Sequence, residues 1–119
     1  MKEEPICKVS EDGTKKWHLN DKLHREDGPA IEYPCGTKSW YLNGKRHRED
    51  GPAVIRCDGA KFWYLNDQFH REDGPAIEYA NGDKFWFLDG KEYTEEEFEE
   101  AIKRKLKKKD KGEILRIFK

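Results

Sequence analysis

A repeat of 23 residues is the feature of this sequence that most constrains its fold. Each unit carries one tryptophan and, two residues further on, one leucine. These positions are Trp17, Trp40, Trp63 and Trp86, followed by Leu19, Leu42, Leu65 and Leu88. The heptad His-Arg-Glu-Asp-Gly-Pro-Ala keeps the same period and starts at His24, His47 and His70. A fixed period of roughly 20–50 residues is typical of repeat arrays, in which each unit packs mainly against its neighbours.

Three turn signals divide each unit into strands. The first is a pair of the Asn-Gly type, which tolerates the positive φ angles of a tight hairpin turn. Its copies are Asn20-Asp21, Asn43-Gly44, Asn66-Asp67 and Asp89-Gly90. The second signal recurs at Asp12-Gly13, Cys35-Gly36, Asp58-Gly59 and Asn81-Gly82. The third is the Asp-Gly-Pro bend of the heptad, where proline fixes φ and glycine permits a tight backbone. Its residues are Gly28, Gly51, Gly74, Pro29, Pro52 and Pro75.

Apolar and polar residues alternate between these turns. The tryptophan and the leucine of one unit lie two residues apart, so on a strand they share a face. Alternation of this kind favours an antiparallel sheet with one packed face. We therefore predict a mainly β fold for residues 1–93, a single antiparallel sheet of stacked β-hairpins with two strands in each unit.

Residues 94–119 are predicted to form a helical cap on the last hairpin. Thr94 and Glu97 have the spacing of a capping box, and an apolar stripe begins at Phe98 and continues through Ala101, Ile102 and Leu106. We expect Gly112 to end this helix and a second short helix, or else a strand, to follow. The run Lys103–Lys111 is strongly basic. A solvated face is one interpretation of it, and an acidic partner surface or an anionic membrane is another.

Composition narrows the class of protein. A charged fraction of 41% against 34% apolar residues leans towards disorder, but a periodic aromatic set of 13% argues for an ordered, thin fold. The net charge of −1 argues against a polyanion-binding protein. The opening residues lack a signal-peptide pattern, no apolar run is long enough to span a membrane, and three cysteines fit a reducing compartment. We therefore expect a cytoplasmic protein and no integral membrane protein.

The three heptad histidines argue against a shared metal. If each unit gives two strands about 4.8 Å apart, His24, His47 and His70 lie about 10 Å from one another, too far to converge on one ion. No nucleophile elbow or phosphate-binding loop is present, and three identical copies do not form one asymmetric catalytic constellation. We predict no enzyme, no cofactor and no metal site.

The heptad arginines leave two interpretations open. Arg25, Arg48 and Arg71 could hold phosphate groups, with the histidines, in clefts between units. However, each arginine is followed by Glu and Asp, which favours ion pairs with carboxylates of neighbouring units. In the first case the protein captures a nucleotide or another small ligand, and in the second the heptad is structural.

A one-layer sheet cannot cover all of its aromatic residues. Five of them are predicted to form an exposed contact surface, namely Tyr41, Phe62, Tyr64, Phe85 and Phe87. The function that this favours is a protein-binding module. A homodimer, formed through an edge strand or this aromatic face, is also left open.

The order of motifs within one unit resembles the MORN repeat. In "WYLNGKRHREDGPAVIRCDGAKF" an aromatic strand is followed by Asn43-Gly44-Lys45, by His47 and by Asp58-Gly59. The stretch "REDGPA" departs from the Gly-x-Gly of that family and looks like a divergent variant of bacterial and phage proteins. This resemblance implies a hairpin array that serves as a scaffold. It also implies that the partner could be a host defence or toxin protein in the host cytoplasm.

Overall fold

The protein is a flat, elongated array. The structure, a computed structural model, describes residues 3–117, and the side chains of residues 3–107. The molecule measures 58 × 44 × 17 Å, and its radius of gyration is 17.7 Å. A compact domain of this length has a radius of gyration of about 13.5 Å. The thin third dimension of 17 Å fits one layer of sheet.

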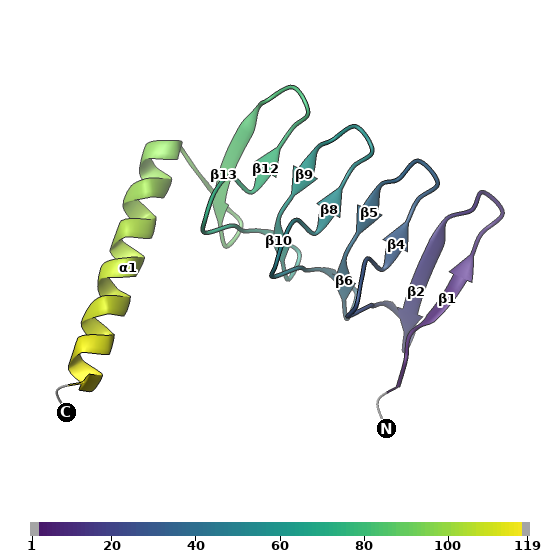
Figure 1. The fold of residues 1–119 in the computed structure, drawn as a ribbon, viewed down its shortest axis with the longest axis horizontal. Coiled ribbons are helices and arrows are strands. Elements are labelled where there is room, and N and C mark those ends of the chain that lie inside the picture. The colour runs from purple at the N-terminus through teal and green to yellow at the C-terminus, as the bar shows by residue number, and fades with distance from the viewer. Residues whose placement is uncertain (1–2, 118–119) are drawn as a thin grey trace.

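Four hairpins stand side by side and form the main antiparallel sheet (Figure 1). They are β1 (Ile6–Val9) with β2 (Lys15–Leu19), β4 (Ile31–Glu32) with β5 (Lys38–Ser39), β8 (Val54–Ile55) with β9 (Lys61–Phe62), and β12 (Ile77–Glu78) with β13 (Lys84–Leu88). Each hairpin also pairs with the next one along the row. Their turns end at Gly13, Gly36, Gly59 and Gly82, all with positive φ. The second turn signal is therefore confirmed.

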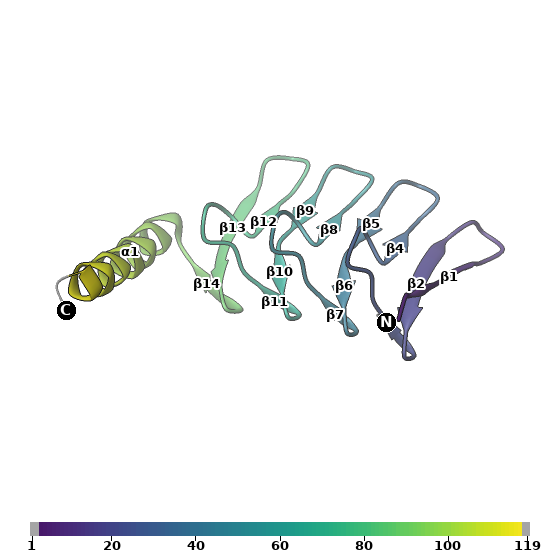
Figure 2. The same ribbon diagram turned by 60° about the horizontal axis from the view of Figure 1, so that its bottom comes forward.

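A second row of hairpins lies below the first, as Figure 2 shows. It consists of β2 with β3 (Lys22–Leu23), β6 (Tyr41–Leu42) with β7 (Lys45–Arg46), β10 (Tyr64–Leu65) with β11 (Gln68–Phe69), and β13 with β14 (Lys91–Tyr93). Both residues of a turn have positive φ, as at Asn43 (51°) and Gly44 (81°). This confirms the first turn signal, because pairs of the Asn-Gly type are the ones that tolerate positive φ at both turn residues.

The two rows arise because the chain changes partners at the tryptophan. The N–H of Trp40 donates to the carbonyl of Ala53 in the upper row, 2.7 Å away, while its carbonyl accepts from the N–H of His47 in the lower row, 3.1 Å away. The same pair of bonds occurs at Trp17 and Trp63. The prediction of two strands in each unit is therefore too simple, because each full unit contains four short strands.

Small residues occupy the tightest positions of the array. The alanines that end the heptads, Ala30, Ala53 and Ala76, are fully buried. Each donates its N–H to the next unit, as Ala53 does to the carbonyl of Phe62 at 2.8 Å. A larger side chain would separate the backbones that meet there. Among the described residues no large side chain is fully buried, so the units are joined along a line and not around a central core.

A single helix, α1 (Glu95–Ile117), closes the C-terminal end beside β13 and β14. The capping box is confirmed, because Thr94 N–H donates to Glu97 Oε1 at 2.9 Å and Glu97 N–H donates to Thr94 Oγ1 at 3.1 Å. Phe98 is buried, but Leu106 is 56% exposed, so the predicted apolar stripe is only partly covered. The prediction that Gly112 ends the helix is wrong, because α1 runs through it. Residues 118–119 of the predicted cap lie outside the described residues.

Candidate functional site

The arginine of each heptad lies flat on the tryptophan of its own unit. The guanidinium of Arg48 is 3.9 Å above the ring of Trp40, and Arg25 and Arg71 lie at the same distance from Trp17 and Trp63. Arg48 Nη1 donates to the carbonyl of Pro52 at 3.0 Å and Nε donates to Asp50 Oδ1 at 3.0 Å. The arginine therefore bonds the loop that follows it in the chain and also lies over an indole ring. Both contacts suit a planar guanidinium.

The heptad glycine makes room for this arginine. A Cβ atom on Gly51 would lie 3.0 Å from Cζ of Arg48, and the equivalent distances at Gly28 and Gly74 are 3.0 and 2.9 Å. None of these three glycines has the positive φ that favours glycine. The predicted bend is present at residues 26–28, 49–51 and 72–74, but its glycine does not use the left-handed backbone region. The glycine is needed because the guanidinium is held between the indole and the loop.

The ion pairs of the heptad arginines lie within one unit. Arg25 Nε is 3.1 Å from Asp27, and Arg71 Nε is 2.8 Å from Asp73. A second carboxylate comes from the following strand, since Arg71 Nη1 is 3.5 Å from Glu78. The prediction that these arginines pair with neighbouring units is therefore wrong. Residues two apart in a tight loop face one another before any neighbouring unit comes within reach.

The heptad histidines connect neighbouring units. Nδ1 of His24, His47 and His70 accepts the backbone N–H of the next lower turn, at 2.9, 3.0 and 2.9 Å. His24 and His70 are buried and His47 is half-buried. Because Nδ1 accepts, Nε2 carries the proton of the neutral ring, and it faces the glutamate two residues later. Among the side chains that the structure describes, those of residues 3–107, no group of His, Cys, Asp and Glu has the arrangement of a metal site.

Grooves run between successive heptads on the tryptophan face. The groove between the first two heptads has a volume of about 720 Å³, with Trp40 and Leu42 among its lining residues. The next groove, about 460 Å³, contains Trp63 and Leu65. Carboxylates line both grooves, from Glu26, Asp27, Glu49, Asp50, Glu72 and Asp73. Arg25, Arg48 and Arg71 line these grooves too, but each already pairs with an aspartate, so the carboxylates leave the grooves unfavourable for a phosphate group.

The predicted aromatic surface is only partly exposed. Tyr64 is buried, so the prediction of exposure is wrong for this residue. Tyr41, Phe62 and Phe87 are half-buried, and Phe85 is 37% exposed. Tyr64 is covered because Arg46 lies 4.2 Å above its ring and donates to its hydroxyl at 3.1 Å. Burial in this place raises the pKa of Tyr64.

Two further aromatic residues connect this set. Tyr79 contacts Phe62 edge-on, with ring centres 5.7 Å apart, and contacts Phe85 at 6.0 Å. Phe69 lies between Tyr64 (4.4 Å) and Phe87 (5.0 Å). The sequence reasoning missed both residues. The period of two would have found Tyr79, because Tyr79 shares a face with Ile77, which is paired with Phe85 and Phe62.

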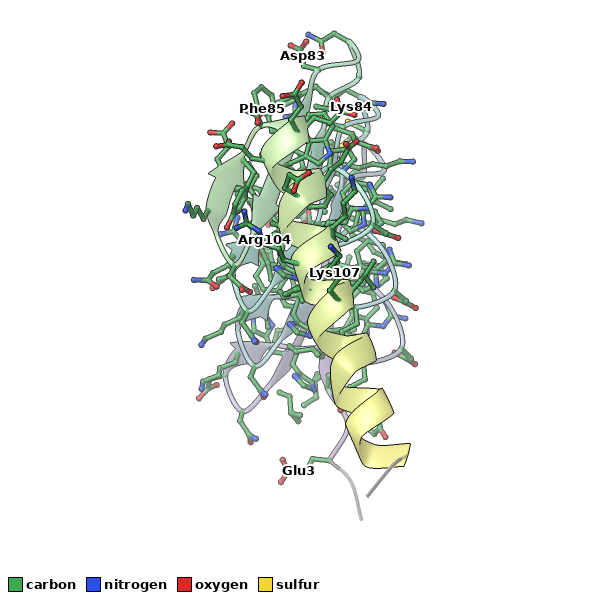
Figure 3. The ribbon with its side chains drawn as sticks, turned by 90° about the vertical axis from the view of Figure 1, so that its left-hand side faces the viewer. Glu3, Asp83, Lys84, Phe85, Arg104 and Lys107 are labelled. Carbon is green, nitrogen blue, oxygen red and sulfur yellow. The ribbon has the colours of Figure 1, made fainter. Side chains whose placement is uncertain are left out.

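The basic half of α1 meets the array at one carboxylate. Lys105 Nζ is 3.3 Å from Glu72 Oε1, and this hydrogen bond lowers the pKa of Glu72. Figure 3 looks along the array from the helix end, with Arg104 and Lys107 on the helix in front. The side chains beyond residue 107 in the predicted basic run lie outside the described part. No helix among the described residues has the length and apolar character that a membrane crossing requires.

Comparisons with known proteins add no relative. No family model, curated protein or solved structure matches this chain. The resemblance to MORN repeats accordingly stays a prediction, carried by the motif order alone. What is established about the chain is its repeated β-hairpin architecture.

Proposed function

We propose that this chain is a non-enzymatic repeat protein that binds another protein through an aromatic row. The row consists of Phe62, Tyr79 and Phe85, and these rings contact one another in sequence. Tyr79 is 38% exposed and Phe85 is 37% exposed. This is the observation that carries the proposal, because large aromatic side chains grouped on an open sheet are the usual anchors of protein interfaces.

The heptad contributes to the scaffold and not to the contact surface in this proposal. Each heptad arginine already contacts an indole, a backbone carbonyl and a carboxylate. Each heptad histidine already accepts a hydrogen bond from the next turn. The repeated units hold the aromatic row rigid, so little side-chain and backbone freedom is lost on binding. The partner that fits is a folded protein with an apolar patch. Inhibition of a host defence or toxin protein is the narrower form of this proposal and has the motif resemblance as its only support.

Capture of a nucleotide is the weaker alternative. It needs guanidinium groups that are free to hold phosphate, but Arg48 is 24% exposed and pairs with Asp50. A panel of nucleotides in a thermal-shift assay tests it directly. A rise of several degrees in the unfolding temperature that Arg48→Ala abolishes would favour capture over protein binding.

The aromatic row has a matched control within the chain. Tyr33 occupies the position of Tyr79 in an earlier unit and is 40% exposed, but it lies outside the row of ring contacts. A partner captured from the native cell should be purified and titrated by calorimetry. Tyr79→Ser with Phe85→Ser should weaken binding at least tenfold, whereas Tyr33→Ser should leave it unchanged. Equal binding by all variants with unaltered circular dichroism would refute the proposed surface.

A further inference from the structure

The last tryptophan of the repeat has lost its arginine. In three units an arginine follows the tryptophan by eight residues and stacks on it at 3.9 Å. Eight residues after Trp86 the chain has Thr94, where the repeat gives way to helix α1. Within the described residues no cation lies over Trp86 as the guanidinium groups lie over the other three indoles. Trp86 is nevertheless half-buried on the same face of the sheet.

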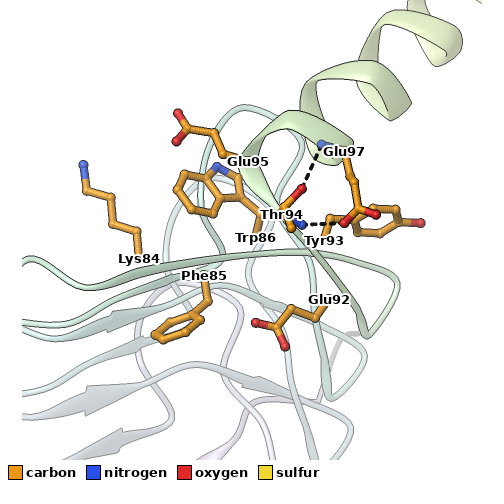
Figure 4. Close-up of a pocket in the computed structure, with 8 residues that line it drawn as sticks. All are labelled: Lys84, Phe85, Trp86, Glu92, Tyr93, Thr94, Glu95 and Glu97. Atoms are coloured by element: carbon orange, nitrogen blue, oxygen red, sulfur yellow. Dashed lines mark hydrogen bonds between the residues drawn. The ribbon is translucent and has the colours of Figure 1, made fainter.

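A pocket opens beside this indole. Its volume is about 380 Å³, and Figure 4 shows the side chains that line it. Trp86 and Tyr93 are paired across β13 and β14 and share one face, with Glu95 and Glu97 on the same side, whereas Phe85 and Glu92 point to the opposite face (Figure 4). Lys84 also lines the pocket and brings one positive charge. Glu97 already accepts a hydrogen bond from Thr94 N–H. Glu92 and Glu95 are exposed, and no described residue forms an ion pair with either of them.

We propose that this pocket takes the side chain of an arginine on the partner protein. The three internal sites show what this indole position holds, namely a guanidinium with a carboxylate beside it. Trp86 offers the same ring, and Glu95, which lies on the same side of the strand in Figure 4, offers the carboxylate. A planar guanidinium can stack and donate sideways at once, whereas an ammonium group is a compact, strongly hydrated charge. Arginine is therefore preferred to lysine.

The pocket adjoins the aromatic row through Phe85, which belongs to both. Phe85 and Trp86 point to opposite faces of β13, so a protein that covers the row must reach round the edge of this strand to place an arginine against Trp86. That the arginine comes from a partner protein rests on the proposed function. The affinity of the pocket for an arginine side chain does not, and a short peptide can test it alone.

The test follows the indole N–H signals of the four tryptophans in the ¹⁵N-labelled full chain by NMR. The signal of Trp86 is assigned as the one that Trp86→Phe removes. Acetyl-Gly-Arg-Gly-amide should shift this signal until it saturates. It should leave the signals of Trp17, Trp40 and Trp63 unchanged, because an arginine of the chain already lies over each of these rings. The lysine peptide should bind more weakly, and the citrulline peptide, which has the same shape without the charge, should not bind. Glu95→Gln should lower the affinity for the arginine peptide about threefold or more, whereas Glu92→Gln, on the opposite face of the strand, should leave it unchanged.

Three results would overturn the proposal. The first is no shift of the Trp86 signal up to about 50 mM peptide, well above the weakest affinity of use to a partner. The second is an equal response to the citrulline peptide, or equal shifts of all four indoles. The third is a shift that appears on raising the protein concentration without peptide, because a second copy would then fill the pocket. A captured partner with no peptide response refutes the pocket alone, and a peptide response with no captured partner refutes the proposed function alone.

Discussion

The packing of a glycine against an arginine predicts an unusual pair of mutational effects. Gly51→Ala places a Cβ atom 3.0 Å from Cζ of Arg48, so the guanidinium must move away from the ring of Trp40. We expect Gly51→Ala to destabilise the protein while Arg48 is present. With Arg48→Ala in place, the same substitution should be neutral or stabilising, because the φ of Gly51 suits an L residue and alanine restricts the unfolded chain.

The magnitudes follow from the contacts of Arg48. Its hydrogen bond to the carbonyl of Pro52 contributes about 1.5–3 kcal/mol because the donor is charged. Stacking on Trp40 contributes about 0.5–1 kcal/mol, and the pair with Asp50, which is 87% exposed, contributes under about 1 kcal/mol. Arg48→Ala should therefore destabilise the protein by about 2–5 kcal/mol. Gly51→Ala, which displaces the guanidinium without removing it, should destabilise by about 1–2 kcal/mol.

The assay is a double-mutant cycle of free energies of unfolding from urea titrations, followed by circular dichroism. Gly28→Ala and Gly74→Ala repeat the measurement in the two other heptads. Asp50→Asn is the matched control, since it keeps the arginine and its bond to the carbonyl. If Gly51→Ala were as destabilising with Arg48→Ala as without it, the glycine would serve the backbone and this reasoning would be refuted.

Three further predictions concern other polar contacts. His47→Ala should destabilise by about 1–3 kcal/mol, measured by urea titration, because the N–H of the next turn loses its acceptor. The pKa of Glu72 is lowered from 4.5 by the hydrogen bond from Lys105, so this pair stabilises the fold above pH 4.5 and its contribution is lost as the pH falls through the lowered pKa. Lys105→Gln should thus cost under about 1 kcal/mol at pH 7 and nothing at pH 2, and an equal cost at both would contradict the assignment. The side-chain hydrogen bond with Thr37 lowers the pKa of Cys35 to about 7. Iodoacetamide at pH 7 should therefore label Cys35 before the other two cysteines, as mass spectrometry can show, and Thr37→Val should remove the difference.

The hairpin array could be predicted because local chemistry determines it. Pairs such as Asn43-Gly44 adopt positive φ at low cost wherever they stand, and the spacing of Trp40 and Leu42 assigns them to one face of a strand. The capping box of Thr94 and Glu97 is equally local. Such signals need no knowledge of which units are neighbours.

The roles of the heptad residues could not be predicted in the same way. Arg48 lies over Trp40 because the chain folds back onto a residue eight positions earlier. The 23-residue period alone does not predict this contact. The need for Gly51 follows only once that guanidinium is placed. Tyr64 was expected to be exposed, and it is buried because Arg46 covers its ring. The positions of these side chains depend on contacts between side chains, which the alternation of apolar and polar residues does not predict.

The continuity of α1 was missed for a related reason. A glycine inside a helix destabilises it by only about 1 kcal/mol, and the flanking residues of Gly112 are good helix formers. The pocket beside Trp86 also depends on a comparison between units. The sequence contains this signal, because Thr94 breaks the spacing that links tryptophan to arginine in the three other units.

The account rests on the heptad arginines being part of the fold, and the NMR signals of their Nε–H groups test this most directly. Ring currents of Trp17, Trp40 and Trp63 should move the signals of Arg25, Arg48 and Arg71 upfield, and their hydrogen bonds should slow exchange with water. Arg104, on the exposed helix surface, should give an ordinary, rapidly exchanging signal. Signals of Arg25, Arg48 and Arg71 that all resemble the signal of Arg104 would contradict this role of the heptad arginines.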